Sequence, residues 1–195
     1  MEAPGRQVRR GFADLLRDRL GLLDAPHYQE QVTAIAAVMT QAFRSGRKVL
    51  WCGNGGSAAD AQHLAAEFSG RFLRERAGLP SEALTVNTSA LTAIANDFGY
   101  ENVFVRQIEA FVRPGDVVVG ITTSGGSKNV VRGLAEAKRR GAMTVAFTGN
   151  GGGAVAEFAD LILLGPTGYS ALVQEVHITM GHIICDLVEQ EMLFG

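Results

Sequence analysis

Five short runs of apolar residues, which do not alternate with polar positions, constrain the fold more than any other feature. A polar or glycine-rich turn follows each run, and the runs lie at 48–52, 83–86, 116–121, 144–147 and 160–164. Continuous apolarity is typical of strands buried on both faces, as in a parallel sheet covered by helices. Helical patterns follow most of the runs. The sequence therefore predicts an α/β fold, a five-stranded parallel sheet sandwiched by helices, of the flavodoxin-like type.

Helical spacing marks both ends of the chain. Apolar residues recur with this spacing at 8–23 and at 28–43, and Asp24-Ala25-Pro26 separates the two patterns, which predicts an N-terminal helical pair. Residues 170–192 contain no breaker except Gly181 and are expected to form one long helix. Because we find no linker or repeat and the chain has 195 residues, we expect a single domain over residues 1–195.

Composition excludes several classes of protein. With 47% hydrophobic and 19% charged residues, the chain is neither disordered nor a coiled coil. A net charge of −2 provides no basic field for nucleic acid. The two cysteines, Cys52 and Cys185, cannot form a disulfide framework and suggest a reducing compartment. No apolar run approaches the roughly 18 residues that span a bilayer, and Met1-Glu2-Ala3-Pro4 lacks a secretory apolar region. We expect a cytoplasmic protein without nucleic-acid or membrane partners.

Glycine and hydroxyl residues gather where three predicted strands end, which is where open α/β sheets bind ligands. Such a loop before a helix offers backbone N–H groups and a positive helix end to a phosphate, although ordinary turns and helix caps use the same residues. We prefer the ordinary turn for the third loop and phosphate binding for the second, which has four hydroxyls. No nucleotide motif is present, so a phosphorylated small molecule fits better. The loops are Gly53-Asn54-Gly55-Gly56-Ser57, Thr122-Thr123-Ser124-Gly125-Gly126-Ser127 and Thr148-Gly149-Asn150-Gly151-Gly152-Gly153.

The helix expected after the first loop carries His63 and Glu67, four residues apart and therefore on one face. The pair could be metal ligands or an acid and a base facing a substrate, or simply a structural histidine and a solvated glutamate. Arg71 continues the same face and could pair with an anion. Asn96 and Asp97 lie at the end of another predicted helix. They could contact a ligand, but a role in capping that helix explains these residues equally well.

The long C-terminal helix contains polar residues on an otherwise apolar surface. Gln174 and His182 differ by about 80° around the axis but lie about 12 Å apart along it. Buried histidine and glutamine side chains need partners, so this side is expected to face a site or a subunit boundary. One straight helix can hardly bring both to a single ion with bonds near 2 Å, whereas two copies of the helix from different chains could do so. We therefore hypothesise an oligomeric active site.

Together these residues resemble the sugar isomerase (SIS) domain and, within it, the phosphoheptose isomerases, from the N-terminal helices to the end of the chain. The points of resemblance are Gly53-Asn54-Gly55-Gly56-Ser57, His63, Glu67, Asn96-Asp97-Phe98-Gly99, Thr123-Ser124-Gly125, Ser127, Gln174-Glu175 and His182. The resemblance implies a homotetramer with active sites between subunits, with residues 1–46 used in oligomerisation and residues 47–195 as the α/β core. It also implies conversion of sedoheptulose 7-phosphate to D-glycero-D-manno-heptose 7-phosphate, the first step of nucleotide-activated heptose biosynthesis.

The resemblance also assigns roles to individual residues. It implies a zinc site formed by His63, Glu67, Gln174 and His182. Taken together with the loops and the possible anion contact of Arg71, it leads us to expect substrate contacts from both strand-end loops and from several helices. These residues are Asn54, Gly55, Gly56, Ser57, Glu67, Arg71, Asn96, Asp97, Thr122, Thr123, Ser124, Ser127 and Gln174. Ketose–aldose isomerisation moves a proton between C1 and C2 through an enediol(ate), which needs a base and an acid. We expect Glu67 to be the base and His182 the opposing acid/base, while zinc could orient the sugar and polarise its carbonyl.

Some positions depart from this family. It often has Asn at Gly126, His-Cys at Ala58-Ala59 and Asp-Arg at Ala171-Leu172, and the last difference concerns substrate orientation. Ser57-Ala58-Ala59 and residues 91–97 also resemble a sister group that binds the bacterial replication initiator, a binding module rather than an enzyme. Glu67 and His182 favour the enzyme group. A third class, the sugar-phosphate-sensing regulators, normally carries a DNA-binding module, for which we expect no room here.

Overall fold

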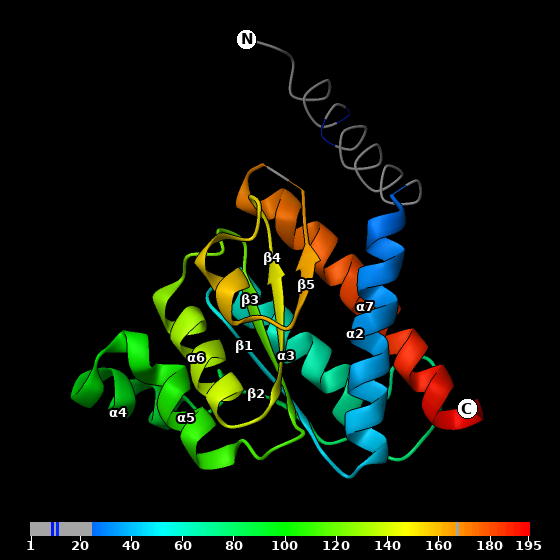
Figure 1. The fold of residues 1–195 in the computed structure, drawn as a ribbon, viewed down its shortest axis with the longest axis horizontal. Helices are drawn as coiled ribbons and strands as arrows, with labels where there is room; N and C mark the ends of the chain where they lie inside the picture. Colours follow the sequence, from blue (N-terminus) through cyan, green and yellow to red (C-terminus); the bar gives the residue numbers. More distant parts are fainter. Residues whose placement is uncertain (1–8, 10, 12–24, 167) are drawn as a thin grey trace.

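A computed structural model of the chain describes Arg9, Gly11, residues 25–166 and residues 168–195. Its centre is a parallel sheet with the strand order β2-β1-β3-β4-β5 (Figure 1). The strands are β1 (Val49–Gly53), β2 (Ser81–Ala83), β3 (Val117–Thr122), β4 (Met143–Thr148) and β5 (Leu161–Leu164). The predicted five-stranded parallel sheet is therefore confirmed. The helix predicted over residues 8–23 lies outside the described residues, apart from two of them.

Both faces of the sheet are apolar, which explains the continuous runs in the sequence. Successive side chains of a strand point to opposite faces. Trp51 and Val119 therefore pack on one side, whereas Leu50 and Val118 pack on the other. All four are at most 3% exposed. The register is uninterrupted, with Gly53 beside Ile121, so the carboxyl ends of β1 and β3 meet at one edge.

Helices cover the two faces in separate layers (Figure 1). One face carries α2 (Pro26–Arg44), α3 (Gly56–Ser69) and α7 (Ser170–Phe194). The other carries α5 (Val103–Phe111), α6 (Lys128–Arg139) and the short η2 (Gly153–Phe158). Beyond α5 and η1 (Tyr100–Asn102), α4 (Thr88–Phe98) forms an outlying element. This layering puts α3 and α7 side by side.

Two sequence-based expectations need correction. The strand expected at 83–86 lies at Ser81–Ala83, because the chain turns after Ala83 and the N–H of Val86 donates to its carbonyl oxygen. As an edge strand β2 pairs with β1 alone. Contrary to the expected lack of a long apolar segment, α7 has the length and composition to cross a membrane. Its packing against α2 and α3 is that of a core helix.

Candidate active site

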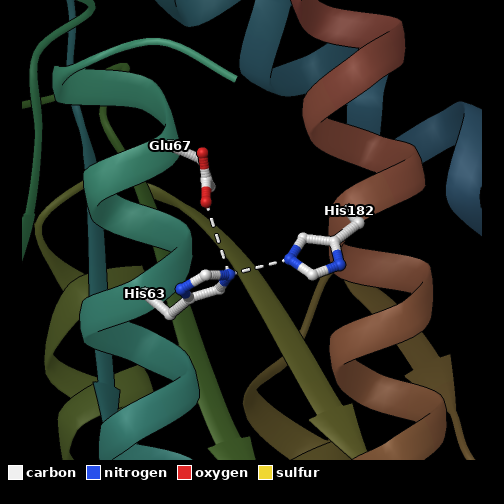
Figure 2. Close-up of side chains that lie close together, drawn as sticks. All are labelled: His63, Glu67 and His182. Carbon is white, nitrogen blue, oxygen red and sulfur yellow. Dashed lines mark hydrogen bonds and ion pairs between the residues drawn. The ribbon is translucent and has the colours of Figure 1, made fainter. Parts of the chain in front are cut away.

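His63, Glu67 and His182 converge where α3 and α7 lie side by side (Figure 2). His63 Nε2 lies 2.8 Å from His182 Nε2 and 3.3 Å from Glu67 Oε1. The four-residue spacing on α3 aligns the first two side chains. Gly181 lets α7 approach, because a Cβ added there would lie 2.7 Å from Leu64 Cδ1. The two helices thus bring together residues that are 119 positions apart in the sequence.

The electrostatics of this cluster favour a neutral imidazole on α7. Burial lowers the pKa of His182, and the nearby His63 lowers it further, while Glu67 opposes both effects. Asp60, one turn before His63, has its pKa raised mainly by burial and also by Glu175, whereas His63 lowers it. Its Oδ2 atom is buried and has no hydrogen-bond partner within the described part of the chain. Asp60 shares the α3 face of His63 by its three-residue spacing, a signal that the sequence analysis did not use.

The cluster has the donor set of a metal site. Two imidazole nitrogens and one carboxylate oxygen lie within 4.8 Å of one another. A tetrahedral zinc ion with bonds of about 2.0 Å holds its ligand atoms about 3.3 Å apart. The separation of His63 from Glu67 already has this value, and that between the two imidazoles is 0.5 Å shorter. Small side-chain movements would therefore admit an ion.

Gln174, the fourth residue of the expected zinc site, lies elsewhere in the same chain. Its amide packs against the start of α3, because a Cβ added at Gly56 would lie 2.6 Å from Gln174 Nε2. His63 is about 10 Å further along α3, and His182 is about 12 Å further along α7. One chain therefore offers three of the four expected ligands at one point.

The loop after β1 is fixed by side-chain hydrogen bonds that the sequence did not reveal. The amides of Asn54 and Asn129 donate to each other, with both distances 2.8 Å. The Tyr100 hydroxyl also donates to Asn54 Oδ1, at 3.2 Å. Asn129 is buried in the first turn of α6. These contacts join the end of β1 to α6 and η1.

The hydroxyl-rich loop after β3 lies at the N-terminus of α6. The hydroxyls of Thr122 and Ser127 are 3.0 Å apart, and Ser124 Oγ accepts a hydrogen bond from the N–H of Gly126 at 3.2 Å. Thr123 donates to the hydroxyl of Ser170 on α7, 3.1 Å away. The first N–H groups of a helix lack intrahelical acceptors and favour an anion. The arrangement suits a phosphate group.

The third loop, after β4, packs against the backbone of the second loop. Gly125 has a φ of +68°, and a Cβ there would lie 2.1 Å from the carbonyl oxygen of Gly152. The N–H of Val155 donates to the Gly125 carbonyl oxygen at 2.9 Å. This contact between backbones accounts for Gly125 in the second loop and for Gly153 in the third, in agreement with the preferred interpretation of the third loop as a turn.

Comparisons with known proteins find relatives of one family. The SIS domain family matches residues 23–149. The phosphoheptose isomerase of Aquifex aeolicus is 49% identical over 94% of this chain and 95% of that protein. The phosphoheptose isomerase of Roseiflexus is 55% identical over 83% of this chain and 82% of the Roseiflexus protein. The solved phosphoheptose isomerase of Neisseria gonorrhoeae superimposes with a TM-score of 0.89 at 40% identity, covering 96% of this chain and all of that one.

The chain belongs to the phosphoheptose isomerase family. It is a sugar phosphate isomerase, and the alternative function as an initiator-binding module is not favoured. The SIS match ends at residue 149, but β5 and α7 continue the same fold beyond it.

Two of the residues expected in a phosphoheptose isomerase site lie apart from the cluster within this chain, and a third, Arg71, follows α3. Asn96 and Asp97 are exposed near the end of α4, where Asn96 Nδ2 donates to Asp97 Oδ1 at 2.8 Å. Because α4 packs beside α5 and η1, both lie across the sheet from α3 and α7. Arg71 is exposed just beyond the end of α3.

Proposed function

We propose that the chain converts sedoheptulose 7-phosphate to D-glycero-D-manno-heptose 7-phosphate and thereby begins the synthesis of nucleotide-activated heptose. The observation that carries this proposal is the convergence of Glu67 with two imidazoles, in a fold whose strand ends provide a hydroxyl loop suited to phosphate. The relatives named phosphoheptose isomerase, at about half identity over most of the chain, support this choice of substrate.

In the proposed mechanism Glu67 takes a proton from C1 of the ketose and returns it to C2. Its carboxylate is only partly exposed, with 20% of the side chain accessible, which limits competition from water. His182 exchanges a proton with the substrate oxygens through Nδ1, which leaves Nε2, the nitrogen that faces His63, for a metal ion. His63, 2.8 Å from His182, fixes the orientation of that ring.

We propose that His63, Glu67 and His182 also hold a zinc ion, with Gln174 supplied by a second copy of the chain. A bound ion would polarise the carbonyl and orient the sugar. Two imidazoles and a carboxylate are the ligand types that catalytic zinc sites use. Because a carboxylate has two oxygens, Glu67 can bind the ion through one and handle the proton with the other.

The phosphate is assigned to the hydroxyl loop and the start of α3. Thr122, Thr123, Ser124 and Ser127 would donate hydroxyl hydrogen bonds at the positive end of α6. Asn54, Gly55, Gly56 and Ser57 would contact the sugar from the adjoining strand end, together with Gln174. Binding the remote phosphate holds the reacting carbons in place. Arg71, Asn96 and Asp97 are proposed as further substrate contacts from elsewhere in the assembly.

The proposed assembly is a homotetramer with active sites between subunits, in the cytoplasm. Apolar α4 supports it, because none of its residues is buried and Phe98 is 52% exposed. A groove of about 380 Å³ between α2 and α7 offers a second surface, in agreement with an oligomerisation role for residues 1–46. Both cysteines are free and buried, and burial raises the pKa of the Cys52 thiol to about 12, as a reducing compartment allows.

The experiment is an NMR assay of sedoheptulose 7-phosphate with the parent protein, with Glu67→Gln and with Glu157→Gln, each with and without a chelator. Glu157 is exposed on η2 and serves as the matched control. We expect turnover by the parent and the control, at least a 100-fold loss in Glu67→Gln and a strong loss with chelator. An active, folded Glu67→Gln enzyme would contradict the assigned base, and a parent without turnover would contradict the proposed reaction.

A further inference from the structure

A buried acid on α7 lies outside the proposed mechanism. Glu189 is fully buried, and its Oε1 accepts from the N–H of Phe72 at 3.0 Å. Its Oε2 accepts from the N–H groups of Leu73 and Arg74, both at 2.8 Å. Burial alone would raise the pKa of Glu189, but these three N–H groups and the charge of Arg76 outweigh it and lower the pKa. The ionised carboxylate therefore fixes the backbone of the segment that follows α3.

Arg76 ties the same carboxylate to the end of α3. Its side chain is only 3% exposed, and its Nε lies 3.2 Å from Glu189 Oε1. The guanidinium donates to the carbonyl oxygens of Glu67 and Phe68, both at 2.8 Å. The last carbonyls of a helix lack intrahelical donors, so Arg76 satisfies them with a favourable charge. We call Arg76 and Glu189 the α3–α7 clamp, because they join the two helices that carry the cluster.

The clamp places one aromatic ring on the active site. Phe72, whose backbone N–H Glu189 holds, stacks on the imidazole of His182, with ring centroids 5.5 Å apart and planes 19° apart. At the edge of that imidazole, His63 lies at 5.0 Å with an interplanar angle of 71°. Phe72 also packs against the apolar core of this face. The His182 ring is therefore covered on one face and contacted by His63 at its edge.

We propose that Phe72 is a positioning residue for His182, and that the α3–α7 clamp holds Phe72 in place. A flat ring against the imidazole face restricts rotation about the last side-chain bond of His182, so that Nε2 stays directed at His63 and Glu67. Partners that orient a ligand or an acid/base side chain are typically worth tenfold to a hundredfold in metal affinity or activity. This inference rests on the proposed function in that His182 acts in it.

The test compares Phe72→Leu, which removes the ring but keeps an apolar side chain, with Phe72→Tyr, which keeps the ring. For Phe72→Leu we expect kcat to fall about tenfold or more while KM changes less than about threefold, because the phosphate loop is untouched. Phe72→Tyr should keep kcat within about threefold of the parent. Phe111→Leu is the matched control, because Phe111 is an exposed ring on α5 on the far side of the sheet.

Two readouts separate this proposal from the proposed reaction. Affinity for Co²⁺, measured by competition with a chromophoric chelator, should fall at least tenfold in Phe72→Leu and stay unchanged in Phe111→Leu. In protein labelled with ¹³C-histidine, the His182 ring resonances should move in Phe72→Leu, because the ring current of Phe72 is lost. Among the four histidines, His182→Asn assigns these resonances.

The outcomes are distinct. A folded Phe72→Leu protein with the kcat and the Co²⁺ affinity of the parent would overturn the positioning role, even if the His182 resonances move with the loss of the ring current. A parent that does not turn over the sugar phosphate would refute the proposed reaction, while the Co²⁺ comparison would still decide the role of Phe72. Melting temperatures identify a variant that fails to fold, and Phe72→Met, with a flexible apolar side chain, then replaces Phe72→Leu.

Discussion

His177 should make the protein sensitive to mild acid. The side chain is fully buried on α7, and its Nε2 donates to the Thr148 carbonyl oxygen at 3.1 Å. Its Nδ1 is buried and has no hydrogen-bond partner within residues 25–166 and 168–195. Burial lowers the pKa of His177 from 6.5 to about 4, although the bond to Thr148 opposes this. No charged neighbour in the described part of the chain contributes to this shift, so desolvation of the imidazolium is the cause.

The sign and size of the effect follow from this difference in pKa. Between pH 6.5 and pH 4 the unfolded chain binds a proton at His177 and the folded chain does not, so stability falls as the pH falls. The loss is about 3 kcal/mol once the pH is below 4, and about 1.4 kcal/mol at pH 5.5. Above pH 6.5 the contribution of His177 to stability is constant.

Urea denaturation at pH 7.5 and pH 5.5 measures this effect, with the fluorescence of Trp51 as the signal. Trp51 is the single tryptophan and is fully buried, so its emission reports global unfolding. His177→Gln removes the titrating group, and the loss of stability between the two pH values should be about 1.4 kcal/mol smaller than in the parent. Protein concentration is held fixed because assembly contributes to stability. Equal pH dependence in the parent and His177→Gln would refute the reasoning.

Four further substitutions, one of them a control, test other contacts. Gly120→Ala places a Cβ 2.7 Å from Val130 Cγ1, between β3 and α6, and should lower the free energy of unfolding by about 1–3 kcal/mol in urea denaturation. Gly126→Ala is the control, because the nearest atom to its added Cβ is 3.8 Å away and the loss of stability should be much smaller. Gly181→Ala should push α7 away from Leu64 and lower Co²⁺ affinity more than about tenfold, so unchanged affinity would contradict the role of Gly181 in the approach of the helices. Asp116→Asn removes the charge of a buried carboxylate that accepts a hydrogen bond from Lys48 Nζ at 2.6 Å. Because the ammonium group then lacks its anionic partner, the free energy of unfolding should fall by about 3 kcal/mol.

The strands of the sheet could be predicted because each strand is marked by a pattern within its own short stretch of sequence. A strand buried on both faces must be apolar along its whole length, and β1, β3, β4 and β5 lie within one or two residues of their predicted positions. The strand β2 begins two residues and ends three residues before its predicted position, because the chain turns after Ala83. The apolar Leu84 lies beyond its end and packs into the core on the α5–α6 side, which no local pattern distinguishes from a strand position.

The residues of the site likewise differ in whether a local sequence pattern predicts them. His63 and Glu67 share a helix face, which the four-residue spacing predicts directly. His182 joins them only through the packing of α7 on α3, so its role came from the resemblance to a family and not from the pattern. Asn129 and Phe72 depend entirely on how distant segments meet, and their neighbours in the sequence give no signal. The expected separation of Gln174 from His182 along one helix is what the structure shows.

This separation gives the sharpest test of whether subunits share a site. If Gln174 of one chain serves the Glu67 and His182 of another, then Glu67→Gln and Gln174→Ala proteins, each weakly active alone, should complement each other when refolded together. In a mixed pair across a two-fold interface, one of the two sites has both residues intact, so random mixing should restore about one quarter of the parent activity. If Gln174 instead serves its own chain, each chain carries a defective site and the mixture should be no more active than the sum of its parts. The structure favours complementation, because the Gln174 amide packs against Gly56 at the start of α3, whereas His63 lies about 10 Å further along that helix.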